Sequence, residues 1–455
     1  RDYMADPALL GQTFGGESWG AWRALLAGFD GLPLSDSEAE TFRLLTGRSA
    51  PSEALEELWL IIGRRGGKSL TAALLAVIVA TREDYTDCLA PGEWATVMVI
   101  AQDRKQARTV YRYVHGLLRS CPMLTKLVDR DTTEGVELAG RVAIEIHTAS
   151  FRAVRSYTLA AAVLDEVAYW HDEGSNPTAE IIEALRPGLA TLGGRLIALS
   201  TPHARRGPLW DTWRANYGQE DSPILVAKAD TRSLNPGFPQ KVIDQALERD
   251  EPRARAEYLA EFRSDVETFI GREAVESCII PGRIELPPVS GTSYRAFVDP
   301  SGGSKDSFTL AIGHREGDRV IVDALREAKP PFSPEGVAAE YAGLLQSYGI
   351  AKVTGDRYAG EWPREQFRKY GIEYQAAAKP KSDLYLALLP ALNSGQAELP
   401  EHTRLLNQIV SLERRTARGG KDSIDHPPAG HDDLCNAVAG IVTELGKRRA
   451  EPFIL

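Results

Sequence analysis

The stretch that decides the fold is Leu58-Trp-Leu-Ile-Ile-Gly63-Arg-Arg-Gly-Gly-Lys-Ser69. Its first five residues form a short apolar run, which is typical of a parallel strand buried on both faces. Residues 63–67 are glycine and arginine and predict a loop, and the Ala/Leu-rich residues 69–83 predict a helix. A glycine-rich loop between a strand and a helix lets backbone N–H groups wrap a phosphate, and the helix N-terminus adds partial positive charge.

The side chains of this loop match the chemistry of a nucleoside triphosphate site. Lys68 is expected to reach the β- and γ-phosphate oxygens, and Ser69 to hold the Mg²⁺ that accompanies ATP. The strict pattern GxxxxGK[ST] fails at one position, because Ile62 stands where the first glycine is expected. A basic surface turn is the alternative. The candidate nucleotide-binding residues are Gly63, Arg64, Arg65, Gly66, Gly67, Lys68 and Ser69.

A second apolar run, residues 159–164, ends in the carboxylates Asp165 and Glu166, roughly 100 residues after the loop. We expect Asp165 to bind Mg²⁺ and Glu166 to orient and deprotonate the water that attacks the γ-phosphate. An Asp-Glu pair alone often only caps a turn. Following a phosphate loop in the same α/β pattern, it indicates a hydrolytic site.

Two further pairs of side chains in this half are candidates. Ser200 and Thr201 end a predicted strand, and their hydroxyls could sense the γ-phosphate; a simple turn is the equally open alternative. Arg152 and Arg155 precede the Asp-Glu strand. An arginine there could stabilise phosphoryl charge in a neighbouring subunit, and a solvated surface arginine is the alternative.

The order of elements predicts an α/β architecture in two separate halves. Residues 1 to about 50 are expected to be helical, with Trp19 and Trp22 as anchors. Strands that alternate with helices then favour a parallel sheet. The predicted strands of this half are 58–62, 96–101, 142–147, 159–164 and 195–200.

The rest of the chain changes character twice. Residues 211–265 are charged and helix-like, and residues 266–290 carry Gly and Pro with little periodicity, which we interpret as a linker. A new α/β unit then begins with a three-stranded meander. The predicted domains are 1–210, 211–265 (a small lid), 266–290 (linker) and 291–455.

Composition narrows the class of protein. Of 455 residues, 43% are apolar and 25% are charged, which excludes collagen-like, disulfide-scaffold and disordered chains. A net charge of −10 argues against a simple polycation that coats nucleic acid. The four cysteines form no CxxC pair, so no zinc site or disulfide framework is expected. The apolar run 70–80 is too short to span a bilayer and no signal-peptide pattern is visible, so we expect a soluble intracellular protein.

Acidic residues at strand and helix ends mark a second site. Asp299 follows the first strand of the meander, Asp356 follows a strand at 352–355, and Asp432 and Asp433 open a helix. Carboxylates from separate elements can converge on two divalent ions about 4 Å apart, which activate water and stabilise the leaving oxygen of a phosphodiester. A turn or N-cap role is the alternative for each residue alone.

Nearby polar residues are weaker candidates. Asp306 lies in a predicted loop and Asp323 in mid-strand, so neither is favoured as a metal ligand. The basic segment 414–421, Lys379 and Lys381 could grip phosphates or could be solvated.

The order of these motifs, with Glu257-Tyr-Leu-Ala-Glu-Phe-Arg263 and His431-Asp-Asp-Leu-Cys-Asn-Ala437, resembles the large terminase subunit of tailed bacteriophages. That family packages viral DNA, and the resemblance covers nearly the whole chain. It implies an ASCE-type P-loop ATPase domain with a small helical lid, followed by an RNase H-like nuclease domain. It also implies a Walker A motif at 63–69, a Walker B motif at 163–166, a coupling motif at 200–202, and nuclease metal ligands at Asp299, Asp356 and Asp433.

The resemblance further implies cofactors and partners. These are ATP with Mg, two divalent ions (Mg or Mn) in the nuclease, double-stranded DNA, the portal protein, the small terminase subunit and a ring of copies on the portal. The site of action would be the host cytoplasm, on viral procapsids, with no membrane. Arg155 matches the position of a proposed trans-acting arginine finger.

One departure from the family pattern concerns the last acidic motif. The family often has Asp-x-x-Asp there, and Asn436 replaces the final Asp. Of the two neighbouring carboxylates we prefer Asp433 to Asp432, because on a helix Asp433 shares a face with Asn436.

Three functions compete on this evidence. The first is a DNA-packaging ATPase and endonuclease. The second is an ATP-driven translocase whose C-terminal domain binds DNA without cleaving it. The third is a non-enzymatic capsid-assembly protein with an inert ATPase fold.

Overall fold

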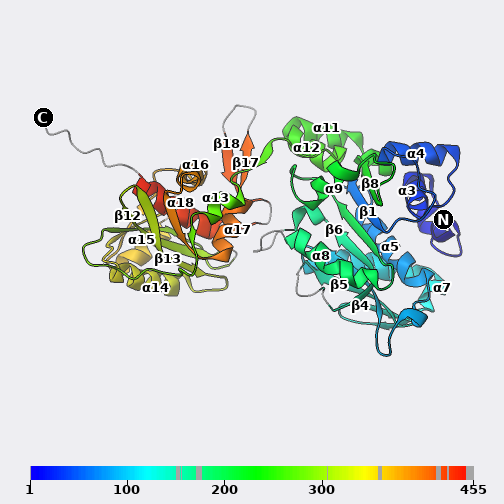
Figure 1. The fold of residues 1–455 in the computed structure, drawn as a ribbon, viewed down its shortest axis with the longest axis horizontal. Helices are drawn as coiled ribbons and strands as arrows, with labels where there is room; N and C mark the ends of the chain where they lie inside the picture. Colours follow the sequence, from blue (N-terminus) through cyan, green and yellow to red (C-terminus); the bar gives the residue numbers. More distant parts are fainter. Residues whose placement is uncertain are drawn as a thin grey trace. The chain divides into compact units, whose positions relative to one another are not determined.

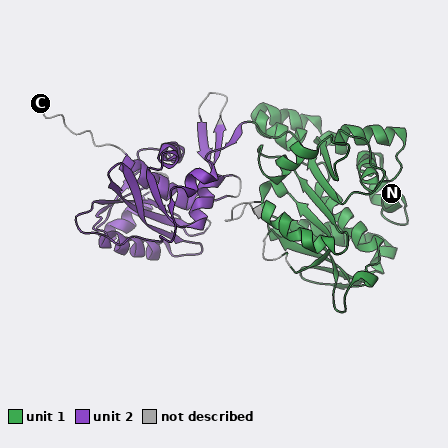
Figure 2. Ribbon diagram, viewed as in Figure 1, with its two compact units in different colours: residues 1–172, 176–264 green, residues 173–175, 265–455 purple. Residues whose placement is uncertain are grey.

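The computed structural model describes residues 2–149, 154, 156–170, 177–304, 306–356, 361–416, 422–427 and 430–446. The chain divides into two compact units (Figure 2). Unit 1 spans residues 1–172 and 176–264, and the described residues of unit 2 all lie within 265–455. Across the described ranges, no helix is both long and apolar enough to cross a membrane.

Unit 1 is built on an eight-stranded, mostly parallel sheet (Figure 1). The strand order is β3-β4-β5-β2-β6-β7-β1-β8. Neighbouring strands are parallel in the part β5-β2-β6-β7-β1-β8 and antiparallel in the part β3-β4-β5. The strands are β1 (Glu57–Ile62), β2 (Ala95–Ala101), β3 (Val128–Asp131), β4 (Gly135–Leu138), β5 (Val142–Thr148), β6 (Thr158–Asp165), β7 (Arg195–Ser200) and β8 (Ile224–Ala229). The parallel α/β sheet expected from the sequence is confirmed. Because β7 lies between β1 and β6, the strand order is the ASCE arrangement expected from the resemblance.

Helices cover both faces of this sheet. The helices described in unit 1 are α1 (Asp2–Ala5), α2 (Gly11–Phe14), α3 (Gly20–Phe29), α4 (Asp36–Thr46), α5 (Lys68–Arg82), α6 (Arg104–Ser120), α7 (Pro122–Thr125), α8 (Pro177–Ala190), α9 (Pro208–Asn216), α10 (Thr231–Leu234), α11 (Gln240–Arg249) and α12 (Glu251–Leu259), with short 3-10 turns at η1 (Glu17–Trp19), η2 (Thr86–Cys88) and η3 (Val167–Tyr169). Alternate residues of β1 enter two cores: Leu60 packs with α5 and α6, and Ile61 packs with α8 and α9. A strand buried on both sides needs the continuous apolar run that the sequence shows.

The region interpreted as the lid, residues 211–265, departs from that prediction. It contains β8, which pairs with β1 from Glu57 to Ile62 and so belongs to the main sheet. Only the following segment consists of helices, α10 to α12 with short connections between them, and unit 1 ends at Ser264. The apolar run within β8 is short and lies among charged residues, which hides it in the sequence.

Unit 2 is built on a seven-stranded sheet with the order β10-β16-β13-β12-β11-β14-β15. β11, β12 and β13 form an antiparallel meander, and β14 and β15 continue from β11 in parallel. This is the RNase H-like arrangement expected from the resemblance. The strands are β10 (Ile279–Ile280), β11 (Tyr294–Asp299), β12 (Phe308–Glu316), β13 (Arg319–Ala328), β14 (Lys352–Gly355), β15 (Glu373–Ala376) and β16 (Ala397–Pro400).

Two layers of helices enclose the unit 2 sheet. They are α13 (Arg272–Glu276), α14 (Pro334–Ser347), α15 (Trp362–Lys369), α16 (Lys381–Asn393), α17 (Thr403–Ser411) and α18 (Asp433–Gly446). Along β11, Phe297 packs in the core with α16, α17 and α18, while Val298 packs in the core with α14 and α15. A small second sheet joins β9 (Val266–Thr268), β17 (Glu413–Thr416) and β18 (Asp422–Asp425).

The segment 266–290, which the sequence predicted to be a linker, is instead part of unit 2. It contains β9, α13 and β10, and its side chains Phe269, Ile270 and Val275 are buried in the core of unit 2. These apolar residues are spaced irregularly because the segment changes from strand to helix within a few residues. Periodicity therefore could not reveal them.

Candidate active sites

The loop after β1 is shaped by two left-handed residues. Gly67 has φ +95° and Arg65 has φ +67°, and the N–H of Gly66 donates to the carbonyl of Gly63 at 3.1 Å. Glycine adopts positive φ at little cost. The chain therefore turns tightly and enters α5 with Lys68 and Ser69 in its first turn.

The outer wall of the loop is held by other elements of unit 1. The indole Nε1 of Trp22, on α3, donates to the carbonyl of Gly66 at 3.0 Å. Gly63 lies against α10 and α12 so closely that an added Cβ would stand 2.6 Å from Thr231 Oγ1 and 2.7 Å from the carbonyl of Tyr258. Position 63 therefore has no room for a larger side chain, and glycine is required there for packing.

The two loop arginines have different surroundings. The guanidinium of Arg64 forms an ion pair with Glu257 at 3.3 Å, and its backbone N–H donates to the carbonyl of the same residue. Arg65 is exposed, and its carbonyl accepts from Asn235 Nδ2 at 3.0 Å. Arg64 thus fastens the loop to α12, while the Arg65 side chain stays open to solvent.

Lys68 lies where the ends of β1, β6 and β7 meet. Its side chain is only 7% exposed. Nζ donates to Thr201 Oγ1 at 2.6 Å and to the carbonyl of Ile62 at 3.1 Å, and lies 3.5 Å from Glu166 Oε1. The structure therefore brings together the predicted phosphate-binding, water-activating and coupling residues.

Glu166 is held in a strained backbone conformation just after β6. Its φ and ψ are 56° and 45°, a left-handed geometry that non-glycine residues rarely adopt. Carboxylate Oε2 accepts from the Thr201 N–H at 3.0 Å and lies 3.1 Å from Ser200 Oγ. The end of β7 therefore fixes the direction in which this carboxylate points.

The neighbouring Asp165 fits an Mg²⁺ site. It is 1% exposed, and burial followed by repulsion from Glu166 raises its pKa to about 7. Its Oδ1 is buried with no hydrogen-bond partner among the described residues. A buried carboxylate oxygen without a donor is costly, and a bound cation would remove that cost. Ser69 supplies a half-buried hydroxyl in the first turn of α5.

The candidate arginines Arg152 and Arg155 lie outside the described residues. Their predicted role in a neighbouring subunit therefore stays a prediction.

In unit 2, two of the predicted carboxylates lie beside α18. Asp299, the last residue of β11, accepts from Asn436 Nδ2 at 2.8 Å, and Asp433 Oδ2 accepts from the Ser307 N–H at 3.2 Å. Burial, and then repulsion from neighbouring carboxylates, raises the pKa of Asp299 well above its ordinary value. Burial likewise raises the pKa of Asp433 to about 6. This concentration of negative charge suits a divalent cation.

Asp356 follows β14, which pairs with β11, so its backbone lies next to Asp299. Its N–H donates to the Val298 carbonyl at 3.3 Å, and its charge contributes to the raised pKa of Asp299. The donor set consists of hard oxygens, which Mg²⁺ and Mn²⁺ prefer. Asn436 adds a buried Oδ1 with no hydrogen-bond partner in the described chain. The residues present therefore fit divalent ions.

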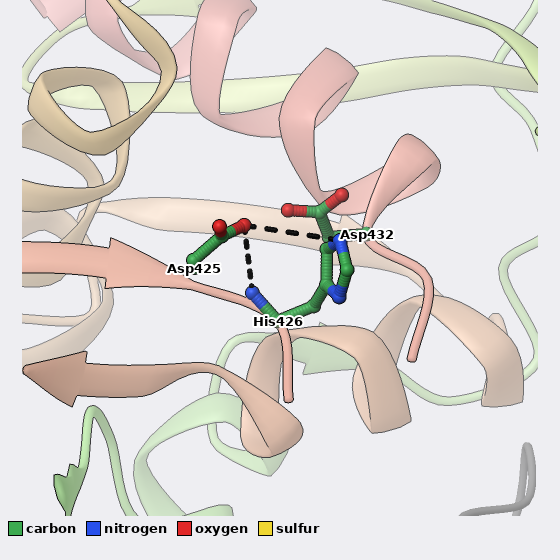
Figure 3. Close-up of side chains that lie close together, drawn as sticks. All are labelled: Asp425, His426 and Asp432. Atoms are coloured by element: carbon green, nitrogen blue, oxygen red, sulfur yellow. Dashed lines mark hydrogen bonds and ion pairs between the residues drawn. The ribbon is translucent and has the colours of Figure 1, made fainter. Parts of the chain in front are cut away.

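Asp432 and Asp433 point to different partners. Asp432 Oδ2 accepts from Tyr385 OH at 2.7 Å and from Lys381 Nζ at 2.9 Å. Figure 3 shows Asp432 gathered with Asp425 and His426, the group whose possible ligand atoms all lie within 4.8 Å of one another. In the described chain the three predicted nuclease ligands form no group as tight as that one.

The weaker sequence candidates have local partners. Asp323 lies 2.7 Å from His314 Nδ1, Asp306 lies 3.7 Å from His431 Nδ1, and Arg414 pairs with Asp422 across the β17–β18 hairpin. Residues 417–421, the rest of the basic segment, lie outside the described chain. Lys379 lines a cavity of about 480 Å³ with Arg315.

Several contributing residues escaped the sequence reasoning. Trp22 was expected only as a helix anchor, and Tyr385 and Asp425 were not singled out. No motif marks them, because their contacts join segments far apart in the chain. The only signal in the sequence was Trp22 itself, an aromatic residue in a predicted N-terminal helix.

No protein-family model and no curated protein matches the chain. Solved structures of phage large terminases are similar to it, as the motifs led us to expect. The HK97 bacteriophage large terminase is 18% identical over 86% of this chain and 91% of its own, with a TM-score of 0.39. The large terminase of the thermophilic bacteriophage D6E, in complex with ATP-gamma-S, is 12% identical over 94% and 99%, with a TM-score of 0.40. The large terminase nuclease of the thermophilic phage G20c, with bound magnesium, is 17% identical over 38% and 95%, with a TM-score of 0.33.

Proposed function

We propose that this chain is the motor subunit that hydrolyses ATP to move double-stranded DNA into a viral procapsid, and that unit 2 cuts the DNA as a metal-dependent endonuclease. One observation carries the proposal. A single chain joins Lys68, Thr201 and Glu166, which contact one another in unit 1, to the carboxylates Asp299 and Asp433 in unit 2. A translocating nuclease needs both kinds of site.

The residues of unit 1 divide the work of hydrolysis. When ATP binds, the loop amides and Lys68 take the phosphates, so Nζ leaves Thr201 and Glu166. The Glu166 carboxylate, still held by the Thr201 N–H, then accepts the proton of the attacking water. Because Thr201 touches both groups, the end of β7 responds to the γ-phosphate.

Mg²⁺ would be held by Ser69 and Asp165 in unit 1. In unit 2, Mg²⁺ or Mn²⁺ ions would be held by Asp299, Asp356 and Asp433. Bound ions supply charge that neutralises phosphoryl oxygens and lower the pKa of water. Asn436 positions Asp299 through its Nδ2, and Ser307 positions Asp433 through its N–H.

The assembly follows from the same function. The partners are double-stranded DNA, the portal of the procapsid and the small terminase subunit, and copies of the chain form a ring on the portal in the host cytoplasm. In such a ring Arg155 would act on the nucleotide of the neighbouring subunit.

A translocase whose unit 2 only binds DNA is the second candidate. Plasmid nicking by the purified chain with Mn²⁺, with Mg²⁺ and with EDTA separates the two. The proposal expects nicking with either ion and none with EDTA, together with ATP hydrolysis. Hydrolysis without metal-dependent nicking would favour the second candidate, and absence of both activities would reject both.

A further inference from the structure

Lys381 sits inside a group of side chains that otherwise has the composition of a metal site. Asp425, His426 and Asp432 each offer a ligand atom, and these atoms lie within 4.8 Å of one another (Figure 3). Carboxylate oxygens and imidazole nitrogen are ligands for first-row divalent ions. In this group, however, the positive charge comes from the chain itself.

The lysine ammonium bridges the two carboxylates. Nζ lies 2.9 Å from Asp425 Oδ1 and 2.9 Å from Asp432 Oδ2. These are hydrogen-bond distances for a charged pair, and Lys381 and Asp432 are 29% and 7% exposed. Burial works against the ammonium, but Asp432 and Asp425 raise the pKa of Lys381 above its ordinary value, so it stays charged.

Asp432 is fixed from a second side. The same Oδ2 accepts from Tyr385 OH at 2.7 Å, and Tyr385 is fully buried on α16, four residues after Lys381. The next residue, Asp433, has no part in this network and instead accepts from Ser307. Two adjacent carboxylates at the start of α18 are thus assigned to different partners.

We propose that Lys381 is a built-in cation that takes the place of a divalent ion between Asp425 and Asp432 and so withholds Asp432 from the nuclease metals. The second half of this statement rests on the proposed nuclease function, and the first half does not. Lys381 is a positioning residue here: it acts on DNA cleavage only through Asp432. Without it, the Asp425, His426 and Asp432 group would be free to bind Mn²⁺.

Counting bound Mn²⁺ per full-length chain by electron paramagnetic resonance tests this. Lys381→Met keeps the length of the side chain and removes the charge, and it should bind one more Mn²⁺ per chain than wild type. Lys381→Arg keeps the charge and should bind the wild-type number. In Lys381→Met with Asp425→Asn, the additional ion should be lost.

The outcomes separate this proposal from the nuclease assignment. Adding Asp299→Asn to Lys381→Met should leave the additional ion in place, because that ion lies outside the nuclease ligands. A wild-type chain that binds no Mn²⁺ in unit 2 would count against the nuclease but not against Lys381. An unchanged count in a folded Lys381→Met protein would overturn the proposal. If that variant melts early, Mn²⁺ should restore its melting temperature, and no recovery would equally overturn it.

Discussion

At the scale of single residues, Glu166 is positioned by hydrogen bonds that an amide can also accept. Glu166→Gln keeps an oxygen for the Thr201 N–H but cannot take a proton from water. We expect ATP binding to persist and turnover to fall on the order of 10²–10⁴-fold. Turnover and nucleotide affinity are measured together, with exposed Glu83→Gln as the matched control. Wild-type turnover in Glu166→Gln would remove this residue from the chemistry.

Thr201 gives buried Lys68 its shortest contact, at 2.6 Å. Thr201→Val keeps the shape but leaves the ammonium short of an acceptor, which should destabilise nucleotide-free unit 1 by about 1–3 kcal/mol. A non-hydrolysable ATP analogue should reduce the difference in stability between Thr201→Val and wild type, because phosphate oxygens replace the lost acceptor. Thermal unfolding with and without the analogue measures it, with Thr201→Ser as control. If the analogue leaves this difference in stability unchanged, the contact assigned to Lys68 would be contradicted.

Asp433 should make unit 2 sensitive to pH when metals are removed. Its folded-state pKa of about 6 lies above the ordinary Asp value near 3.9, so protonation favours the folded state. In EDTA, lowering the pH from about 7 to 5 should therefore increase the free energy of unfolding of unit 2. Raising the pH again should reverse this increase. A gain of a few degrees is expected, since 1 kcal/mol moves the melting temperature by roughly 2–4 °C in a domain of this size.

The comparison protein for that pH series is Asp433→Asn, which has no such proton to bind. Its melting temperature in EDTA should change less than that of wild type over the same range. Mg²⁺ should also abolish the difference, because the ion replaces the proton on the carboxylate. Identical pH profiles for the two proteins in EDTA would refute the raised pKa.

At the scale of elements, α3 supports the phosphate loop through one indole. Trp22→Phe keeps a large buried ring and removes the hydrogen bond to the Gly66 carbonyl. The loss of about 1 kcal/mol should weaken ATP binding roughly fivefold, if the loop relaxes in the free protein. Equilibrium nucleotide binding measures this, with the half-exposed Trp94→Phe as control. Equal weakening in both variants would point to a general loss of stability instead.

Elements with a strong local signal could be predicted from the sequence. β1, its loop and α5 follow from one stretch, because a doubly buried strand, a glycine turn and an Ala/Leu helix each carry their own pattern. β8 and residues 266–290 could not, since their place depends on partners elsewhere: β8 on β1, and β9 on β17. The same holds for Asp432, whose separation from Asp433 depends on Lys381 and Tyr385 of α16.

At the scale of the whole molecule, the chain carries two acidic centres with different surroundings. In unit 1 the carboxylates Asp165 and Glu166 face a lysine, as a site for a phosphorylated ligand requires. In unit 2, Asp299 and Asp433 accept hydrogen bonds from the neutral donors Asn436 and Ser307, and the charge of Asp433 contributes to the raised pKa of Asp299, which suits a metal ion. Because each centre is built within its own unit, damage to one should spare the other.

The most direct test of this account measures plasmid nicking and ATP hydrolysis on one preparation of the full-length Asp299→Asn protein. This change keeps the shape of the side chain and removes one negative charge at the end of β11. Nicking with Mn²⁺ should fall to the level seen in EDTA, while ATP hydrolysis stays within about twofold of wild type, because the change destabilises neither the loop nor β7. Undiminished nicking, or loss of both activities in a protein that melts like wild type, would contradict the existence of two independent sites.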